Sequence, residues 1–247
     1  MLEEKGIIIC NECIAKDTYR MKIAAGMAKE MKPGQFVNVK IDGFMLRRPI
    51  SISSIEEDGF VLVYKVVGDG TLELSKKLAG APIDVFGPLG SSYPIHDDVD
   101  EVLLIGGGVG VPPLYELAKQ CRAKGKIVNV VLGFNDCDSI FYEEEFKALG
   151  CNVAIATMDG SYGVKGTVMD AIKEGNITCD FTYSCGPRPM LKAIEAAYTK
   201  GYMSFESRMA CGMGACMACV AKDKQEENLY HRICKEGPVF PIGKVEF

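Results

Sequence analysis

The pattern of apolar residues changes near Asp97, and this change constrains the architecture that the chain can adopt. Before Asp97, short runs of β-favouring residues are separated by turn signals such as Lys32-Pro33-Gly34. The runs cover residues 6–13, 19–25, 35–40, 50–55 and 60–67, followed by a helical pattern at 71–78 and a loop at 87–92. Five or six short strands at this spacing predict a small antiparallel β-barrel.

After Asp97 the sequence alternates between strand and helix patterns. Strands are expected at residues 101–105, 126–134, 152–158 and 181–185, and helices at 112–123, 143–149, 167–173 and 187–200. This alternation predicts a parallel sheet covered by helices, with ligands at the carboxyl ends of the strands. We therefore expect a barrel domain (1–97), an α/β domain (98–205) and a C-terminal lobe (206–247). The lobe is too short to bury a core alone, so we expect it to pack on the rest of the chain.

The composition argues against several classes of protein. With 48% hydrophobic and 25% charged residues, the chain is typical of a globular protein. No apolar run approaches the roughly 18 residues of a membrane span, and the first residues lack the pattern of a signal peptide. The net charge of −5, with both signs interleaved, argues against a nucleic-acid partner. We expect a cytoplasmic protein that contacts neither membrane nor nucleic acid.

Four of the eleven cysteines form a spaced group, Cys211-x4-Cys216-x2-Cys219-x14-Cys234. In a reducing compartment, clustered cysteines indicate metal or redox chemistry rather than disulfides. C-x4-C-x2-C with a distant fourth cysteine is the spacing of plant-type [2Fe-2S] ligands. A zinc site is the main alternative, but structural zinc usually has two C-x2-C pairs and this segment has one. Four buried free cysteines are the other alternative.

A glycine-rich turn follows the first strand of the α/β region. Gly106-Gly107-Gly108-Val109-Gly110 leads through Pro113 into a helix, a geometry in which backbone N–H groups can bind a pyrophosphate. Pro113 replaces the third glycine of the dinucleotide fingerprint, so a plain tight turn remains an alternative. Cys185-Gly186-Pro187 ends the last of these strands at the same sheet edge. Cys185 is therefore either a candidate for contact with a nicotinamide ring or a buried apolar cysteine.

Two features of the barrel region are suited to an anion. Arg48 lies beside a strand in Arg47-Arg48-Pro49-Ile50-Ser51, where its guanidinium can hold a phosphate. Gly68-Asp69-Gly70-Thr71 ends another strand and opens a helix. Each feature alone is more typical of a solvated strand end. Together, ahead of a nucleotide-binding region, they favour a phosphate-bearing cofactor.

Taken together, these segments resemble the ferredoxin–NADP reductase superfamily over nearly the whole chain. Arg48-Pro49-Ile50-Ser51 is similar to its flavin motif, and Gly70-Thr71 to its flavin-phosphate turn. The segment from Gly107 to Pro113, with Gly108-x-Gly110-x-x-Pro113, is similar to its nicotinamide-nucleotide loop, and Cys185-Gly186-Pro187 to its nicotinamide-side motif. The cysteine segment that begins at Glu206-Ser207-Arg208 resembles the family of electron-transfer subunits of class B, NAD-dependent dihydroorotate dehydrogenases.

This resemblance implies a flavin-binding barrel, a nucleotide-binding α/β domain and a cluster lobe, with FAD, NAD and one [2Fe-2S] cluster. By analogy, Arg48 would bind the FAD pyrophosphate, and Ser51 would hydrogen-bond near the isoalloxazine. The other expected FAD contacts are Pro49, Ile50, Val63, Tyr64, Lys65, Gly70 and Thr71. The expected NAD contacts are Gly107, Gly108, Gly110, Pro113, Cys185, Gly186 and Pro187. Ile50 is a departure, because many superfamily members have a flavin-stacking tyrosine there.

The resemblance also implies a partner. An FMN-containing catalytic subunit would oxidise dihydroorotate in pyrimidine (UMP) biosynthesis, within a heterotetramer. No residues here resemble a general base for that oxidation, so no catalytic residue is assigned to this chain. Two alternatives stay open: the NADH-linked flavin/iron–sulfur subunit of another redox complex, such as a hydrogenase, sulfide or ferredoxin reductase, and a non-enzymatic redox sensor.

Electron counting and charge refine this hypothesis. A nicotinamide exchanges two electrons as a hydride, a [2Fe-2S] cluster exchanges one and a flavin does either, so FAD is expected between the two. Residues 127–146 contain no Lys or Arg, whereas Asp136 and Asp138 are present. Since a 2′-phosphate needs a cationic partner, the sequence favours NAD over NADP. Glu143, Glu144 and Glu145 alternatively form a solvated helix face.

Overall fold

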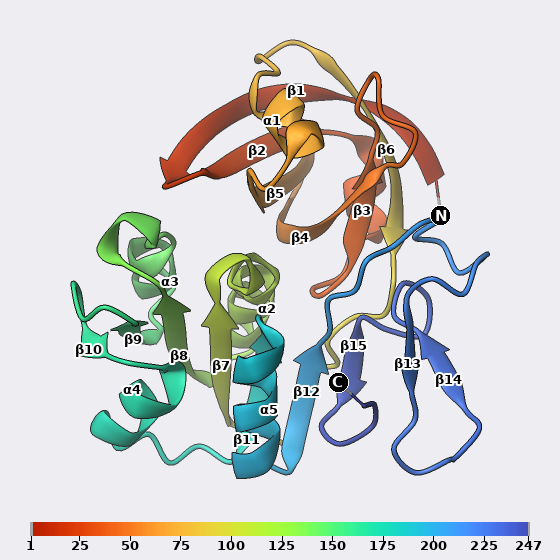
Figure 1. Cartoon of the computed structure of the whole chain (residues 1–247). Helices are drawn as coiled ribbons and strands as arrows, with labels where there is room; N and C mark the ends of the chain where they lie inside the picture. Colours follow the sequence, from red (N-terminus) through yellow and green to blue (C-terminus); the bar gives the residue numbers. More distant parts are fainter. Residues whose placement is uncertain (1, 247) are drawn as a thin grey trace.

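The first part of the chain forms a closed antiparallel barrel in the computed structural model, which describes residues 2–246 (Figure 1). Around the barrel the strands are β1 (Leu2–Ala15), β2 (Thr18–Ala24), β5 (Gly59–Lys65), β4 (Arg48–Glu56), β3 (Phe36–Val39) and β6 (Pro82–Leu89). The long strand β1 pairs with both β2 and β6 and so closes the barrel. A 3-10 helix, η1 (Gly26–Glu30), follows β2, and α1 (Asp69–Ser75) follows β5. The predicted barrel is confirmed.

Strand β6 corrects one detail of the sequence analysis. The loop expected at 87–92 begins later than predicted, because Gly87, Pro88 and Leu89 complete β6. Ile83, Val85 and Leu89 are buried, and this alternation continues through the turn-favouring residues. Burial of an alternating apolar face therefore outweighed the local turn propensity of Gly-Pro.

The second part of the chain forms a seven-stranded sheet in the order β10-β9-β8-β7-β11-β12-β15. Its strands are β7 (Glu101–Gly107), β8 (Ile127–Phe134), β9 (Asn152–Thr157), β10 (Val164–Lys165), β11 (Phe181–Cys185), β12 (Lys200–Ser204) and β15 (Val239–Pro241). The helices are α2 (Pro112–Ala123), α3 (Glu143–Ala148), α4 (Val168–Glu174) and α5 (Arg188–Ala197), with 3-10 turns η2 (Gly108–Gly110) and η3 (Cys137–Ser139). Every neighbouring pair of strands is parallel except β12 and β15.

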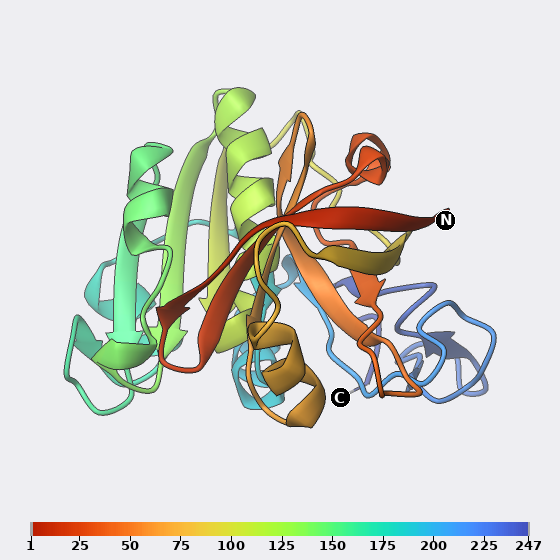
Figure 2. The same cartoon turned by 90° about the horizontal axis from the view of Figure 1, so that it is seen from above.

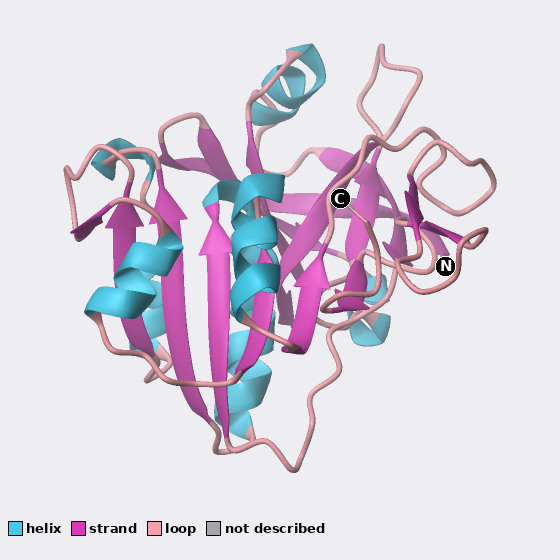
Figure 3. Ribbon diagram, turned by 60° about the horizontal axis from the view of Figure 1, so that its bottom comes forward, coloured by secondary structure: helices cyan, strands magenta, loops and turns pink. Residues whose placement is uncertain are grey.

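Helices cover both faces of this sheet, as Figure 3 shows. On the central strand β7, Val102 and Leu104 pack in one core with α2 and α3. Leu103 and Ile105 point the other way and pack in a second core with α4 and α5. This explains why β7 is a continuous apolar run rather than an alternating one.

The chain after α5 differs from the sequence prediction. The last helix ends at Ala197 instead of continuing to residue 200, and β12 starts at Lys200. Strand β15 then returns from the C-terminal lobe and pairs with β12, while β13 (Val220–Lys222) and β14 (Tyr230–Arg232) form a separate hairpin (Figure 1). Both β12 and β15 are short, and β15 pairs with β12 across more than thirty positions of chain, so local sequence did not indicate them.

Helix α2 lies between the sheet and the barrel, as the view from above in Figure 2 shows. Its residues Leu114 and Leu117 share a core with Val61 and Val63 of barrel strand β5. The two folding units are therefore joined by packed apolar side chains. None of the helices in the described part of the chain combines the length and apolar character of a membrane span.

Candidate functional site

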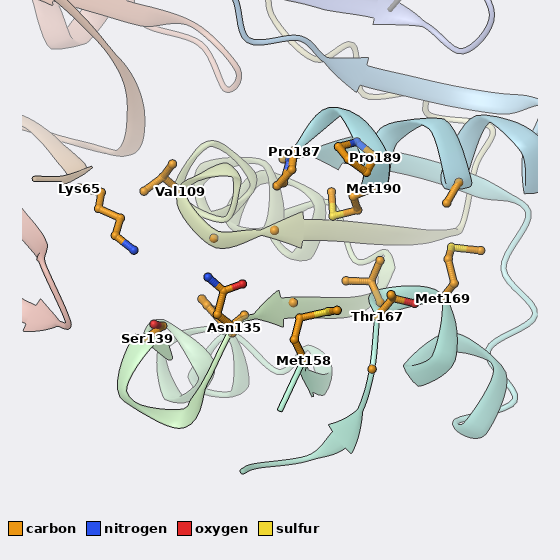
Figure 4. A pocket seen from close by; sticks show the side chains of 18 of the residues that line it. Lys65, Val109, Asn135, Ser139, Met158, Thr167, Met169, Pro187, Pro189 and Met190 are labelled. Carbon is orange, nitrogen blue, oxygen red and sulfur yellow. The ribbon is translucent and has the colours of Figure 1, made fainter. Parts of the chain in front are cut away.

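A cavity of about 490 Å³ opens at the carboxyl ends of β7, β8, β9 and β11 (Figure 4). Pro187 and Met190 form one side of it, and Asn135 and Met158 lie opposite. Lys65 and Thr18 of the barrel also line it, so both folding units contribute to its wall. Its position is the one at which parallel sheets bind nucleotides.

The glycine turn and the Cys185-Gly186-Pro187 segment meet in this cavity. A Cβ atom on Gly107 would lie 2.7 Å from the Met190 sulfur, and one on Gly110 would overlap the carbonyl of Cys185. Only glycine therefore permits this approach of the two segments. Gly107, Gly108, Gly186 and Pro187 line the cavity, whereas Gly110 and Pro113 lie behind it as buried packing residues.

Cys185 is also buried behind the cavity wall, with 2% of its surface exposed. Burial raises the pKa of its thiol far above the ordinary value, so the thiol stays protonated at neutral pH. The structure thus places the neighbouring Gly186 on the cavity surface, and Cys185 beneath it. Its predicted contact with a nicotinamide stays a prediction.

Glu206 is a cavity residue that sequence reasoning did not assign. It is the one carboxylate among the lining residues, and Lys65 is the one cation. Glu206 is exposed to the cavity but enclosed by its walls, and this partial desolvation raises the pKa of its carboxyl. Recognition of β12 would have located it, because Glu206 comes just after β12 at the edge where β11 also ends.

The region after β8 carries the expected acidic residues, but the fold also brings a cation to it. Asp136 accepts hydrogen bonds from the Ser139 backbone and hydroxyl and lies 3.7 Å from the Lys16 ammonium. Lys16 comes from the turn between β1 and β2, so a survey of residues 127–146 could not detect it. Lys16 is absent from the cavity lining, and Asp136 partly neutralises it.

The two anion-binding features predicted for the barrel converge. A Cβ atom on Gly70 would lie 2.6 Å from an Arg48 guanidinium nitrogen, so the guanidinium stands directly over the start of α1. The Arg48 side chain also lies 4.9 Å from the Phe44 ring centroid and donates to the Leu46 carbonyl. Thr71 closes the same turn, where its hydroxyl accepts from the Val67 N–H at 3.0 Å. These residues fit a phosphate of a flavin nucleotide.

The other predicted flavin contacts divide between the two faces of the barrel wall. Ile50 and Tyr64 are buried in the barrel core, where the Tyr64 hydroxyl donates to the Asn11 side chain at 2.9 Å. Val63 packs on the opposite side, in the core shared with α2. Pro49 is exposed and Ser51 is half-buried. The side chains of Ile50 and Tyr64 therefore support the strands rather than cover the outer surface.

The four predicted cluster cysteines gather in two pairs. The Cys216 N–H donates to the Cys211 sulfur at 3.3 Å, and the Cys234 N–H donates to the Cys219 sulfur at 3.4 Å. Among residues 2–246, no three potential metal ligands are grouped as they would be around a single metal ion. Two pairs of cysteines fit the two irons of a [2Fe-2S] cluster, each with two protein ligands, better than one zinc ion with four ligands.

The backbone around Cys211 favours its thiolate form. Burial raises the pKa of this thiol, but hydrogen bonds from the backbone N–H groups of Met213, Cys216 and Ala215 outweigh burial and lower it to about 6. Gly214 is held in place because its carbonyl accepts from Arg232 at 2.6 Å. The loop is thus built to present sulfur and N–H groups to a negatively charged cluster.

A buried carboxylate organises the rest of the lobe. Asp223 is 1% exposed and accepts from His231 at 2.8 Å, from Lys244 at 2.6 Å and from the N–H groups of Gln225 and Glu226. These partners hold the pKa of Asp223 well below its usual range. His231 therefore belongs to a structural network around a buried carboxylate.

Two family models match the chain. Residues 206–246 match the iron–sulfur cluster binding domain of dihydroorotate dehydrogenase B, and residues 104–196 match the oxidoreductase NAD-binding domain. The first covers the cysteine loop, and the second covers the glycine turn and Cys185-Gly186-Pro187. Both matches agree with the predicted cofactors, an iron–sulfur cluster and a nicotinamide nucleotide.

Similar proteins and a similar structure extend this result to the whole chain. The dihydroorotate dehydrogenase B (NAD(+)) electron transfer subunit of Fusobacterium nucleatum is 50% identical over 249 residues, covering 96% of this chain and 95% of that protein. The protein of the same name from a Geobacillus species is 45% identical, covering 99% of both. A solved structure described as an NADH-dependent reduced ferredoxin-NADP oxidoreductase has 33% identity and a TM-score of 0.88, covering 98% of this chain and 89% of its own. The chain therefore belongs to the family of dihydroorotate dehydrogenase B electron transfer subunits.

Proposed function

We propose that this chain is the electron-transfer subunit of an NAD-dependent dihydroorotate dehydrogenase. In this role it relays electrons between the FMN of a separate catalytic subunit and NAD⁺ in pyrimidine biosynthesis. The observation that carries the proposal is the presence of three sites on one chain. They are the cavity at the glycine turn, the Arg48–Gly70 cradle and the paired cysteines. A hydride donor, a flavin and a one-electron cluster need these three sites.

When bound, FAD supplies the exchange between two-electron and one-electron transfer, and the cluster on Cys211, Cys216, Cys219 and Cys234 supplies single-electron transfer. The chain supplies binding and orientation. Arg48 and the turn at Gly70 hold a flavin phosphate, and Gly107, Gly108 and Gly186 let backbone approach the dinucleotide. Lys65 places a positive charge and Glu206 a carboxyl group in the same cavity.

NAD is the proposed nucleotide. The strand ends that line the cavity, β7, β8, β9 and β11, contribute no Lys or Arg to its wall, since Lys65 comes from the barrel. Among the described residues that line the cavity, none beside Asn135 or Met158 is a Lys or Arg that could pair with a 2′-phosphate. The family name of the curated relatives, which specifies NAD(+), supports the same choice.

Dihydroorotate oxidation is assigned to the partner subunit. The name "electron transfer subunit" in the curated relatives supports a separate catalytic chain. The FMN of that chain, a heterotetrameric assembly and a cytoplasmic location stay predictions.

An anaerobic spectroscopic titration tests this proposal. The purified chain, with FAD and iron quantified, is titrated with NADH, NADPH and dihydroorotate, first alone and then with the candidate catalytic subunit. We expect NADH alone to bleach flavin and cluster bands, NADPH to act weakly, and dihydroorotate to act only when the catalytic subunit is present. Reduction by dihydroorotate without the partner, or a colourless chain, would contradict the proposal.

The same titration, together with a turnover assay with NADH and an artificial acceptor, separates the alternatives. A subunit of another redox complex would be reduced by NADH but would not couple to an FMN-containing dihydroorotate oxidase. A redox sensor would not turn over with NADH and an artificial acceptor. We expect coupling in the first comparison and turnover in the second.

A further inference from the structure

Asn38 is a polar residue in a strand that is buried on both faces. In β3, Val37 and Val39 point into the barrel core, and Phe36 packs in the core that contains Cys219 and Cys234 of the lobe. Because successive side chains of a strand alternate, Asn38 faces the same side as Phe36, toward the lobe. Asn38 is 3% exposed. A buried amide needs a hydrogen-bond partner, since leaving it unpaired opposes folding.

That partner is the cysteine loop. The Asn38 amide nitrogen donates to the backbone carbonyl of Cys211 at 3.3 Å. The next residue, Gly212, has φ of +65°, and a Cβ atom there would overlap the Asn38 amide nitrogen. Glycine is thus required at this position both for its backbone conformation and for the close approach. The loop backbone lies directly on Asn38.

The other side of β3 connects Asn38 to the flavin motif. Asn38 pairs with Pro49 of β4, next to Arg48, which stands over Gly70. Asn38 therefore links the two sites: its backbone pairs with the strand of the flavin cradle, and its side chain bonds to the first cysteine of the loop. In the described residues, Asn38 is the barrel side chain with a hydrogen bond to the backbone of a cluster cysteine.

We propose that Asn38 is the positioning residue that fixes the cysteine loop against the flavin-binding strand, and so sets the stability and environment of the cluster and its electronic contact with FAD. The proposal rests on the proposed function, because it requires FAD and a cluster on the residues assigned above. With FAD and the cluster bound, the electrons would balance as follows: NADH would give a hydride to FAD, which would take one further proton from solvent. The flavin would then release both protons and give two electrons one at a time to the cluster, which would pass each on to the partner's FMN before taking the next. Asn38 takes no part in the preceding hydride transfer.

Asn38→Leu and Asn38→Asp test this role in the full-length chain loaded anaerobically with FAD and iron. Leucine keeps a similar volume without a donor, and aspartate replaces the donor with an oxygen that repels the Cys211 carbonyl. We expect iron loss to an added chelator to accelerate at least about tenfold, since a buried carbonyl loses its partner. We also expect an altered electron paramagnetic resonance spectrum of the reduced cluster and slower cluster reduction. Flavin bleaching by NADH should stay within about twofold of the wild-type rate.

Gln35→Leu is the matched control. Gln35 precedes the same strand, and its side chain bonds to the Gly90 carbonyl at 2.9 Å and to the Lys32 N–H rather than to the backbone of a cluster cysteine. A merely structural effect of a lost barrel amide would appear in both variants as reduced thermal stability. We expect the control to keep wild-type iron retention and cluster spectrum. If Asn38→Leu behaves like this control in both measurements, the proposal is wrong.

Gly212→Ala approaches the same contact from the loop and guards against misfolding of the Asn38 variants. Its methyl group would meet the Asn38 amide, so we expect faster iron loss here as well. In an Asn38→Ala background the added effect of Gly212→Ala should be smaller, because the overlapping amide is gone. Fully additive effects would refute a direct contact. A wild-type chain that binds neither FAD nor iron overturns both this inference and the proposed function, whereas a loaded chain indifferent to Asn38 and Gly212 overturns this inference alone.

Discussion

Glu116 of α2 accepts a hydrogen bond from the backbone N–H of Ile55 in β4 at 2.8 Å, and so ties the helix after the glycine turn to the strand that begins with Arg48. Lys119 strengthens this junction, because its ammonium lies 2.8 Å from Glu116 and donates to the Ile55 carbonyl and the Ser54 hydroxyl. The largely buried ion pair between Glu116 and Lys119 thus fixes the position of the flavin cradle relative to the nucleotide turn.

Lys119→Met tests this junction. The substitution leaves Glu116, which is 5% exposed, without its cation, and we expect the free energy of unfolding to fall by about 1–3 kcal/mol. Reduction of FAD by NADH should also slow, because the two sites lose their fixed relation. Denaturant unfolding and rapid mixing with NADH measure the two effects. Lys147→Met is the control, since Lys147 pairs with Glu143 and Glu144 on a helix surface. If Lys147→Met slowed flavin reduction as much as Lys119→Met, the effect would not be specific to the Glu116–Lys119 junction.

Arg48→Ala should weaken FAD binding. Loss of one charged hydrogen bond costs about 1.5–3 kcal/mol, or roughly 10- to 150-fold in the dissociation constant. Flavin retained after dialysis and titration of the apoprotein with FAD measure the change. Arg47→Ala is matched in residue type and position, but Arg47 pairs with Glu3 and Asp84 and should leave the FAD affinity near wild type. Equal affinities for the two variants would count against the Arg48 assignment.

Cys216→Ser should remove the cluster and leave FAD bound. Cys216 pairs with Cys211 in the loop, and one lost thiolate leaves an iron without its second protein ligand. Iron and flavin content per chain, with the visible spectrum, distinguish these outcomes. Cys137→Ser changes an exposed cysteine at the start of η3 and should alter neither the iron nor the flavin content. Wild-type iron content in Cys216→Ser would refute the ligand assignment.

Asp223 predicts acid sensitivity of the lobe. Its pKa is lower in the folded chain than the ordinary 3.8, because Lys244 and His231 hold the carboxylate. A carboxyl with a depressed folded pKa stabilises the fold above about pH 4, and this contribution is lost as the pH falls below it. Asp223→Asn should therefore have a lower melting temperature than wild type at pH 7.

The pH dependence provides the decisive comparison for Asp223. The difference in melting temperature between wild type and Asp223→Asn should shrink as the pH falls from about 5 to 3. Asp98→Asn, at an exposed carboxylate, is the control and should show little difference at any pH. A difference in melting temperature that stays constant across this range would show that Asp223 does not stabilise the lobe through its charge.

Much of the fold could be predicted because its strongest signals are local. Helix α2 begins at Pro112 and ends at Ala123 as expected, since two prolines fix its start and a buried apolar face defines its length. Strand β11 likewise matches its predicted bounds. Strand β12 and its partner β15 could not be found in this way. They have 5 and 3 residues. Strand β12 pairs with β11 on one side, and β15 pairs with β12 across more than thirty positions of chain.

The candidate site was predictable where a motif carries its own geometry. The spacing of the four cysteines indicated a [2Fe-2S] cluster directly, and the glycine turn indicated a nucleotide. Glu206, Asn38 and Lys16 were not assigned, because each reaches its site from another element and no local pattern marks it. The sequence indicated that Arg48 and the turn at Gly70 serve one phosphate-bearing cofactor, but it did not predict their direct contact, which depends on how β4 and β5 curve around the barrel.

The pairing of β15 with β12 has a consequence for protein engineering. The final segment houses the cysteines and then completes the sheet of the nucleotide domain, where Val239 also exchanges hydrogen bonds with the Ser91 hydroxyl. Truncation before the cysteines would leave β12 as an open edge, which invites association with other chains. If this segment were grafted onto a different reductase, it would have to bring β15 with it, and the host sheet would need an edge strand that can pair with β15. The C-terminal lobe is thus not an independent module, and its loss would leave the remaining flavoprotein with an exposed sheet edge.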